Sequence, residues 1–194
     1  DNCAMVVKNE GGTLKIRYTG EDMLDMPSMA EKELTVRLPR SMSLPELHLS
    51  GVSADFNVAA LPVRDTFTFD TVSGELKTGM IDNCTTAKIN TVSGKVELDG
   101  SFCEISAGST SGEIDLTLRS LPGRVDISTV SGSVDVELAA DNEGFTVDYS
   151  TVSGDLESDF AMKMNGDGTY EYGGGVCRIA VSTTSGDLKI EVID

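Results

Sequence analysis

The stretch that decides the fold is Thr71-Val72-Ser73-Gly74, because it recurs along most of the chain. The same tetrapeptide stands at residues 91–94, 129–132 and 151–154, and the close variants Ser-Thr-Ser-Gly and Thr-Thr-Ser-Gly stand at residues 109–112 and 183–186. The motif serines are therefore Ser73, Ser93, Ser111, Ser131, Ser153 and Ser185, in steps of 20, 18, 20, 22 and 32 residues. Such a period is typical of repeat proteins whose units stack on one another.

Apolar residues recur at fixed distances on both sides of the motif serine. Around Ser131 they are Val125 and Ile127 before it and Val134 and Val136 after it, with polar residues between them. This period-two alternation predicts two short strands per repeat, each with one buried face. Because no comparable stretch has a helical period, we predict an all-β protein.

The Ser-Gly pair between the two strands has a structural role in this interpretation. Ile127 and Val134 are seven residues apart, an odd number, so simple alternation cannot place both inside. A bulge or corner at Ser-Gly must break the phase, and glycine tolerates the backbone angles that this requires. The expected corner residues are Ser73, Gly74, Ser93, Gly94, Ser111, Gly112, Ser131, Gly132, Ser153, Gly154, Ser185 and Gly186.

One repeat buries too few apolar side chains to fold alone, so each must be covered by the next. Stacking at one coil, or rung, per repeat predicts a parallel β-solenoid (β-helix) of about 20 residues per coil. The preference of parallel crossovers favours a right-handed coil. An antiparallel meander in a sandwich is the main alternative, because strands spaced ten residues apart fit both folds.

We expect a single solenoid domain over residues 1–194. Residues 1–40 would form degenerate N-terminal rungs or a cap, and residues 41–194 the regular rungs, with an insertion at about 160–176. Gly11-Gly12 and Leu34–Leu38 suggest two degenerate copies of the repeat in the first part.

Charge and composition exclude several classes of function. Thirty-two acidic against 15 basic residues give a net charge of −17, which disfavours nucleic acid and anionic bilayers as partners. His48 is the single histidine, so sites that need two imidazoles are excluded. No run approaches the roughly 18 apolar residues of a transmembrane helix, and the first residues lack a signal-peptide pattern. A trimmed chain would look the same, so the compartment stays open.

The repeated T-V-S-G with its apolar columns, preceded by Leu34-Thr35-Val36-Arg37-Leu38-Pro39, resembles the bacterial putative-adhesin β-helix family, also catalogued as a domain of unknown function. The resemblance runs from about residue 34 to the C-terminus. It implies a β-helical protein of the cell envelope or extracellular space, often behind a membrane anchor. It carries over no catalytic residue.

Outward-facing carboxylates form the first candidate site. Glu75, Glu113, Asp155 and Asp187 share one column, and Glu97, Asp115, Asp135 and Glu157 share the next. Neighbouring rungs would bring carboxylates close enough to share a divalent cation, or to act as a glycosidase pair. Lys77, Lys95 and Lys189 interrupt the columns and no calcium-loop pattern is present, so we expect a solvated interaction surface around Glu113 and Asp115, with no metal site.

The insertion and the cysteines are further candidates. Tyr170 and Tyr172 in the insertion could stack on a sugar or a peptide, although a hairpin that covers the last rungs would use them for packing. Cys84 and Cys103 fall on neighbouring rungs near the same edge, so a disulfide between them is geometrically possible. Buried free thiols are the equal alternative.

The sequence thus favours a non-enzymatic, adhesin-like interaction scaffold with no catalytic residue and no cofactor. Its partner would be a protein or a cell-surface glycan, with nucleic acid excluded. The alternative is a structural or regulatory module that self-associates end to end, because only eight residues follow Ser185-Gly186 to cover the terminal rung. A polysaccharide-active enzyme is the third and weakest alternative.

Overall fold

The computed structural model describes residues 3–20, 33–39 and 41–193. Within these residues every regular element is a β-strand, so the all-β prediction is confirmed. This part of the chain holds no helix with the length and hydropathy needed to cross a bilayer. The chain divides into two compact units, residues 1–39 and residues 40–194.

The first unit contains an antiparallel hairpin, formed by β1 (Cys3–Glu10) and β2 (Thr13–Gly20). Gly11 and Gly12 form its two-residue turn with φ of 59° and 87°, the positive angles that tight hairpin turns require. The expectation of a degenerate rung at Gly11-Gly12 is therefore wrong, because these glycines reverse the chain where a rung would continue it. Residues 34–38, the second expected copy, form no strand.

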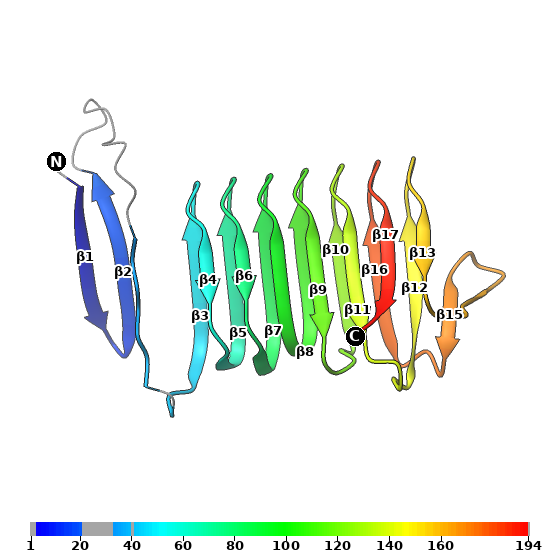
Figure 1. The fold of residues 1–194 in the computed structure, drawn as a ribbon, viewed down its shortest axis with the longest axis horizontal. Helices are drawn as coiled ribbons and strands as arrows, with labels where there is room; N and C mark the ends of the chain where they lie inside the picture. Colours follow the sequence, from blue (N-terminus) through cyan, green and yellow to red (C-terminus); the bar gives the residue numbers. More distant parts are fainter. Residues whose placement is uncertain (1–2, 21–32, 40, 194) are drawn as a thin grey trace. The chain divides into compact units, whose positions relative to one another are not determined.

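The second unit is a 15-stranded, mostly parallel sheet that curls back on itself, so that two rows of strands face each other (Figure 1). The first row contains β3 (Leu44–Gly51), β5 (Leu61–Thr71), β7 (Ile81–Thr91), β8 (Val96–Ser109), β10 (Arg124–Ser128), β16 (Cys177–Ser182) and β12 (Gly144–Ser150). The second row contains β4 (Phe56–Val58), β6 (Leu76–Thr78), the start of β8, β9 (Ile114–Leu118), β11 (Val134–Leu138), β17 (Leu188–Val192) and β13 (Leu156–Ser158). A strand of the first row and the next strand of the second row are called a rung below.

The register of the sheet follows the sequence repeat. Phe67 lies beside Ala87, Ala87 beside Ile105, and Ile105 beside Val125, all in parallel strands. Side chains from the same column of the repeat therefore lie next to one another. The inward-facing columns of the two rows form one continuous core, in which Phe67 and most of its equivalents are buried. The antiparallel sandwich is excluded by this register.

The rungs approach most closely at the Ser-Gly corners. A β-carbon on Gly94 would lie 2.0 Å from the carbonyl oxygen of Gly74, and one on Gly112 would lie 2.1 Å from that of Gly94. Because real β-carbons do not approach a backbone oxygen this closely, these positions have room only for glycine. The repeated Gly of the motif is thus required by the distance between neighbouring rungs.

The order of the rungs differs from the order of the repeats. β16 lies between β10 and β12, and β17 lies between β11 and β13. The last rung of the sequence is therefore inside the stack, although we expected it at the end. The insertion makes this possible, because its strand β15 (Tyr170–Gly173) pairs antiparallel with the outer edge of β12 before the chain returns (Figure 1).

Candidate functional site

The motif residues at each corner bind backbone groups. The buried hydroxyl of Thr129 accepts a 3.0 Å hydrogen bond from the amide of Gly132, and Thr71, Thr91, Ser109 and Thr183 do the same in their own corners. The Ser131 hydroxyl donates to the carbonyl oxygen of Thr110 on the preceding rung. Ser73, Ser93 and Ser111 make the equivalent bond. These hydroxyls stabilise the corners, and the structure gives none of them a partner that would activate a nucleophile.

Three carboxylates of the second row come together as the sequence predicts. One oxygen each from Glu113, Asp115 and Asp135 lies within 4.8 Å of the others. The Lys95 ammonium bridges this cluster, at 2.9 Å from Asp115 and 3.4 Å from Glu113. Its hydrogen bond to Asp115 raises the pKa of Lys95 above its ordinary value. Two of the three carboxylates, those of Glu113 and Asp115, are therefore paired with a protein cation.

Burial changes the ionisation of this acidic cluster. Desolvation raises the pKa of Asp115, although the hydrogen bond from Lys95 opposes the change. Burial also raises the pKa of Asp135, with Glu113 and Glu191 adding to the effect. One oxygen of Asp115 is buried with no hydrogen-bond partner. Carboxylate oxygens of this kind could hold a hard divalent cation, but Lys95 already supplies the positive charge that such an ion would bring.

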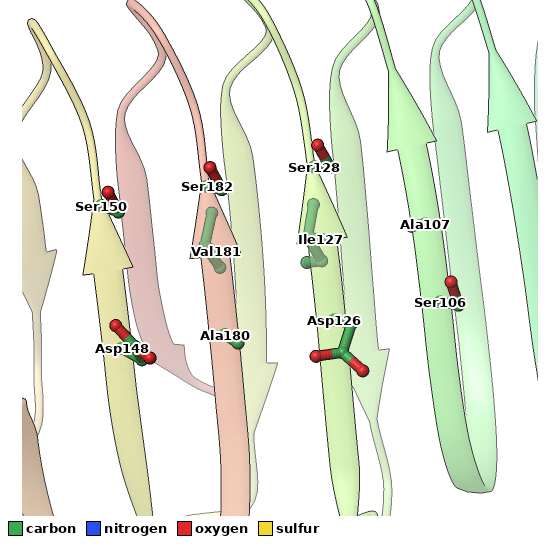
Figure 2. A pocket seen from close by; sticks show the side chains of 10 residues that line it. All are labelled: Ser106, Ala107, Asp126, Ile127, Ser128, Asp148, Ser150, Ala180, Val181 and Ser182. Carbon is green, nitrogen blue, oxygen red and sulfur yellow. The ribbon is translucent and has the colours of Figure 1, made fainter.

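A shallow trough of about 300 Å³ lies on the outward face of the first row, across β8, β10, β16 and β12 (Figure 2). Ala180 stands at its centre with Asp126 beside it on one strand and Asp148 on the other. Beside the side chains of Asp126, Ala180 and Asp148, the hydroxyls of Ser128, Ser182 and Ser150 lie on the same three strands (Figure 2). The hollow exists because Ala180 has only a methyl group where its neighbours carry carboxylates.

Arginines balance the carboxylates of the trough. Arg178 donates a 3.0 Å hydrogen bond to Asp148, and Arg124 pairs with Asp126 on its own strand. The trough therefore presents hydroxyl and carboxylate groups, and the two arginines paired with Asp126 and Asp148 offset the charge of these carboxylates in a molecule of net charge −17. Such a surface can donate and accept hydrogen bonds to a ligand with many hydroxyl groups.

The sequence did not predict the trough, although it contained a signal for it. The small polar residues Ser128, Ser150 and Ser182 occupy one column of the repeat, three residues before the motif serine. What could not be deduced was that Ala180 lies between Asp126 and Asp148, because that contact depends on the rung order. A sequential stack would have placed the two carboxylates side by side.

The insertion forms a hairpin in which Tyr170 and Tyr172 pack against the core, which was the alternative to their binding a sugar or a peptide. β14 (Lys163–Met164) pairs antiparallel with β15, and β15 covers β12. The Tyr172 ring packs against Phe145 and Phe160, with centroid distances of 5.5 and 4.9 Å. Tyr170 is also partly buried against the core. The structure thus uses both tyrosines to cover the core edge, and it does not bring them together with Glu113 and Asp115.

Cys84 and Cys103 are free thiols, so the disulfide that the sequence allowed is absent from the structure. Cys84 lies opposite Phe102 in the register of β7 and β8, and both side chains are buried in the core. Cys103 follows Phe102, so its side chain points to the other face of the strand and is exposed. Opposite directions, rather than distance along the chain, keep the two thiols apart.

Comparisons with known proteins give one family and one distant structure. The family model described as Toastrack DUF4097 matches residues 7–191. A solved structure, described as a putative cell adhesion protein from Clostridium sporogenes, is similar over 98% of this chain and 76% of its own, with 10% identity and a TM-score of 0.46. No curated protein matches the chain.

Proposed function

This chain belongs to the Toastrack DUF4097 family, and from this premise we propose that it is a non-enzymatic, adhesin-like scaffold of the cell envelope that binds a glycan in the trough around Ala180. The trough carries the proposal, because it is a hollow of about 300 Å³ whose lining combines apolar residues such as Ala180 with the side chains of four serines and two aspartates. The envelope location is part of the proposal and follows from the resemblance of the T-V-S-G repeat. The second unit would be the binding domain.

The finer architecture belongs to the same proposal. We take the second unit to be a right-handed β-solenoid with about one coil of 20 residues per rung, as the pairing of Phe67 with Ala87 supports. A rigid stack of this kind holds outward side chains at a constant spacing of about 4.8 Å. The hydroxyls of Ser128, Ser182 and Ser150 would then form a regular row along the stack.

The chemistry of the trough favours a neutral or zwitterionic polysaccharide. Serine hydroxyls and two carboxylates of the lining, with the guanidinium groups paired to those carboxylates, provide both donors and acceptors for sugar hydroxyls. The net charge of −17 would repel polyanionic chains such as heparin at low ionic strength. The regular row of serines would suit a repeating ligand better than a single small molecule.

The non-enzymatic part of the proposal rests on how the acidic groups are used. Asp126 and Asp148 are each paired with an arginine, and Asp115 is paired with Lys95. A glycosidase needs one carboxylic acid and one free carboxylate facing the scissile bond. Incubation of the intact protein with the bound polysaccharide should release no new reducing ends. If the wild type releases reducing ends and the Asp148→Asn variant does not, the non-enzymatic part of the proposal is wrong.

A filling substitution tests the glycan site. Ala180→Phe should fill the trough and reduce binding of an immobilised neutral polysaccharide panel at least tenfold, measured by biolayer interferometry. Thr68→Phe is the matched control, because Thr68 occupies the equivalent outward position on β5, away from the trough. Wild-type protein that binds none of the panel, or equal binding by both variants, would contradict the proposal.

A further inference from the structure

The last rung of the chain, β16 with β17, is held between two rungs that precede it in the sequence (Figure 1). Val181 lies beside Ile127 on one side and beside Tyr149 on the other. In the second row, Leu188 lies between Val134 and Leu156. The rung therefore fills a slot with two walls, and each wall supplies parallel backbone pairing and apolar contacts.

The two walls of the slot fit each other as well as they fit the rung. Ile127 and Tyr149 face the same residue of β16, so removal of the rung would leave β10 and β12 parallel and in matching register. The corners agree, because Gly186 stands against the carbonyl oxygen of Gly132 as Gly154 stands against that of Gly186. The slot can thus be closed without the last rung, and the rung can be absent without a change of register.

The connection before the rung suits a hinge. Gly173 ends β15, and Gly174, Gly175 and Val176 connect it to β16; Gly173 and Gly175 have φ of 61° and 63°. Three consecutive glycines adopt many other backbone conformations at little cost. The hairpin of β14 and β15 remains attached to β12 by its own pairing, so the rung can leave the slot while the hairpin stays in place.

We infer that the last rung, residues 177–192, can be exchanged between two copies of this chain, so that the rung of each copy occupies the slot of the other. The contacts of the exchanged rung would be the same as those in the single chain, because the slot and the rung are unchanged. The relative stability of the single chain and the exchanged pair would therefore depend on the conformation of the hinge and on the concentration of the chain, as in other exchanges of identical elements. Synthesis from the N-terminus also exposes the slot before its own rung is complete.

Paired cysteines on two different chains test the exchange directly. Ser128 and Ser182 are register partners on β10 and β16, so their backbones are at a separation that a disulfide can span. One chain carries Ser128→Cys and the other Ser182→Cys, both with Cys3→Ser and Cys103→Ser. Refolding of the two chains together at high concentration should give at least tenfold more covalent heterodimer than mixing them after separate refolding.

The control pair combines Ser182→Cys with Ser50→Cys. Ser50 lies at the equivalent position of β3, which pairs with β5 and is not a neighbour of β16. This pair should give only background cross-linking. Co-expression of each pair in one cell provides the same comparison without a refolding step. Equal heterodimer yields for the two pairs under both regimes, or only monomer at every concentration tested, would overturn the inference.

Discussion

A β-carbon on Gly186 would lie 2.0 Å from the carbonyl oxygen of Gly132. The two glycines belong to repeats that are not consecutive in the sequence, and they meet because the last rung lies inside the stack. The contact is as close as those between consecutive rungs, such as that of Gly112 with Gly94. The inserted rung is therefore packed as tightly as the sequential ones.

Gly186→Ala should destabilise the fold, because the new methyl group would overlap backbone that cannot move away without separating two rungs. We expect a loss of about 1–3 kcal/mol in the free energy of unfolding, measured by urea denaturation. Gly166→Ala is the control, because nothing lies within 4 Å of a β-carbon at that position. Equal effects at the two glycines would contradict the observed rung order.

Ile127→Ala should cost about 2–5 kcal/mol, because Ile127 is 3% exposed and its loss leaves a cavity in the core. Asp126→Ala should change the free energy of unfolding by less than about 0.5 kcal/mol, because Asp126 faces outward and makes only an exposed ion pair with Arg124. Both values come from the same denaturation experiment. A larger effect at Asp126 would mean that the faces of β10 are reversed.

Thr129→Val should destabilise the corner, because it keeps the shape of the side chain and leaves the Gly132 amide without its 3.0 Å partner. The expected loss is about 1–3 kcal/mol, the cost of a buried unpaired polar group. Thr129→Ser retains the hydroxyl and should lose less, as the natural Ser109 in the equivalent corner indicates. If the valine and serine variants are equally stable, the hydrogen bond does not support the corner.

Asp135→Asn should raise stability at neutral pH relative to the wild type. Burial, Glu113 and Glu191 raise the pKa of Asp135 above its ordinary 3.8 in the folded state, while Lys189 and Lys95 lower it to a smaller extent. The folded state then binds the proton of Asp135 more tightly than the unfolded state does. Protonated Asp135 therefore contributes its full stabilisation below the ordinary pKa of 3.8, and this contribution is lost as pH rises through the raised pKa of the folded state.

Denaturation midpoints measured at several acidic pH values check this sign. The wild type should lose stability relative to Asp135→Asn as pH rises above the ordinary carboxyl pKa, and the difference should become constant at higher pH. A wild type that gains on the variant over this range would show that Lys95 and Lys189 dominate the environment of Asp135.

Cys103 should react with a thiol reagent in the native protein, whereas Cys84 and Cys177 should not. Cys103 is exposed, and burial raises the pKa of the Cys84 thiol and raises that of Cys177 to about 12. A buried thiol that remains protonated is a poor nucleophile. Peptide mass spectrometry after labelling at pH 8 separates the sites. Labelling of Cys84 at the rate of Cys103 would place it outside the core.

Of the two candidate sites, the acidic cluster could be predicted from the sequence, whereas the trough could not, because it depends on the order of the rungs. The cluster of Glu113, Asp115 and Asp135 belongs to consecutive repeats, so the sequence placed these residues together. The trough needs Ala180 between Asp126 and Asp148, and no local pattern brings residue 180 between those repeats. The sequence left the disulfide between Cys84 and Cys103 open, because two cysteines at the same edge of neighbouring rungs can still point to opposite faces of the sheet.

The sequence by itself determined that each repeat forms two strands with a glycine corner, since alternation and the odd spacing of Ile127 and Val134 act within one repeat. It also determined that equivalent residues stack. The tertiary structure alone decided the order of the rungs, because every repeat offers the same columns and the same corner, so neighbouring repeats can pair equally well in more than one order. Long-range contacts, above all β15 on the edge of β12, select the observed one.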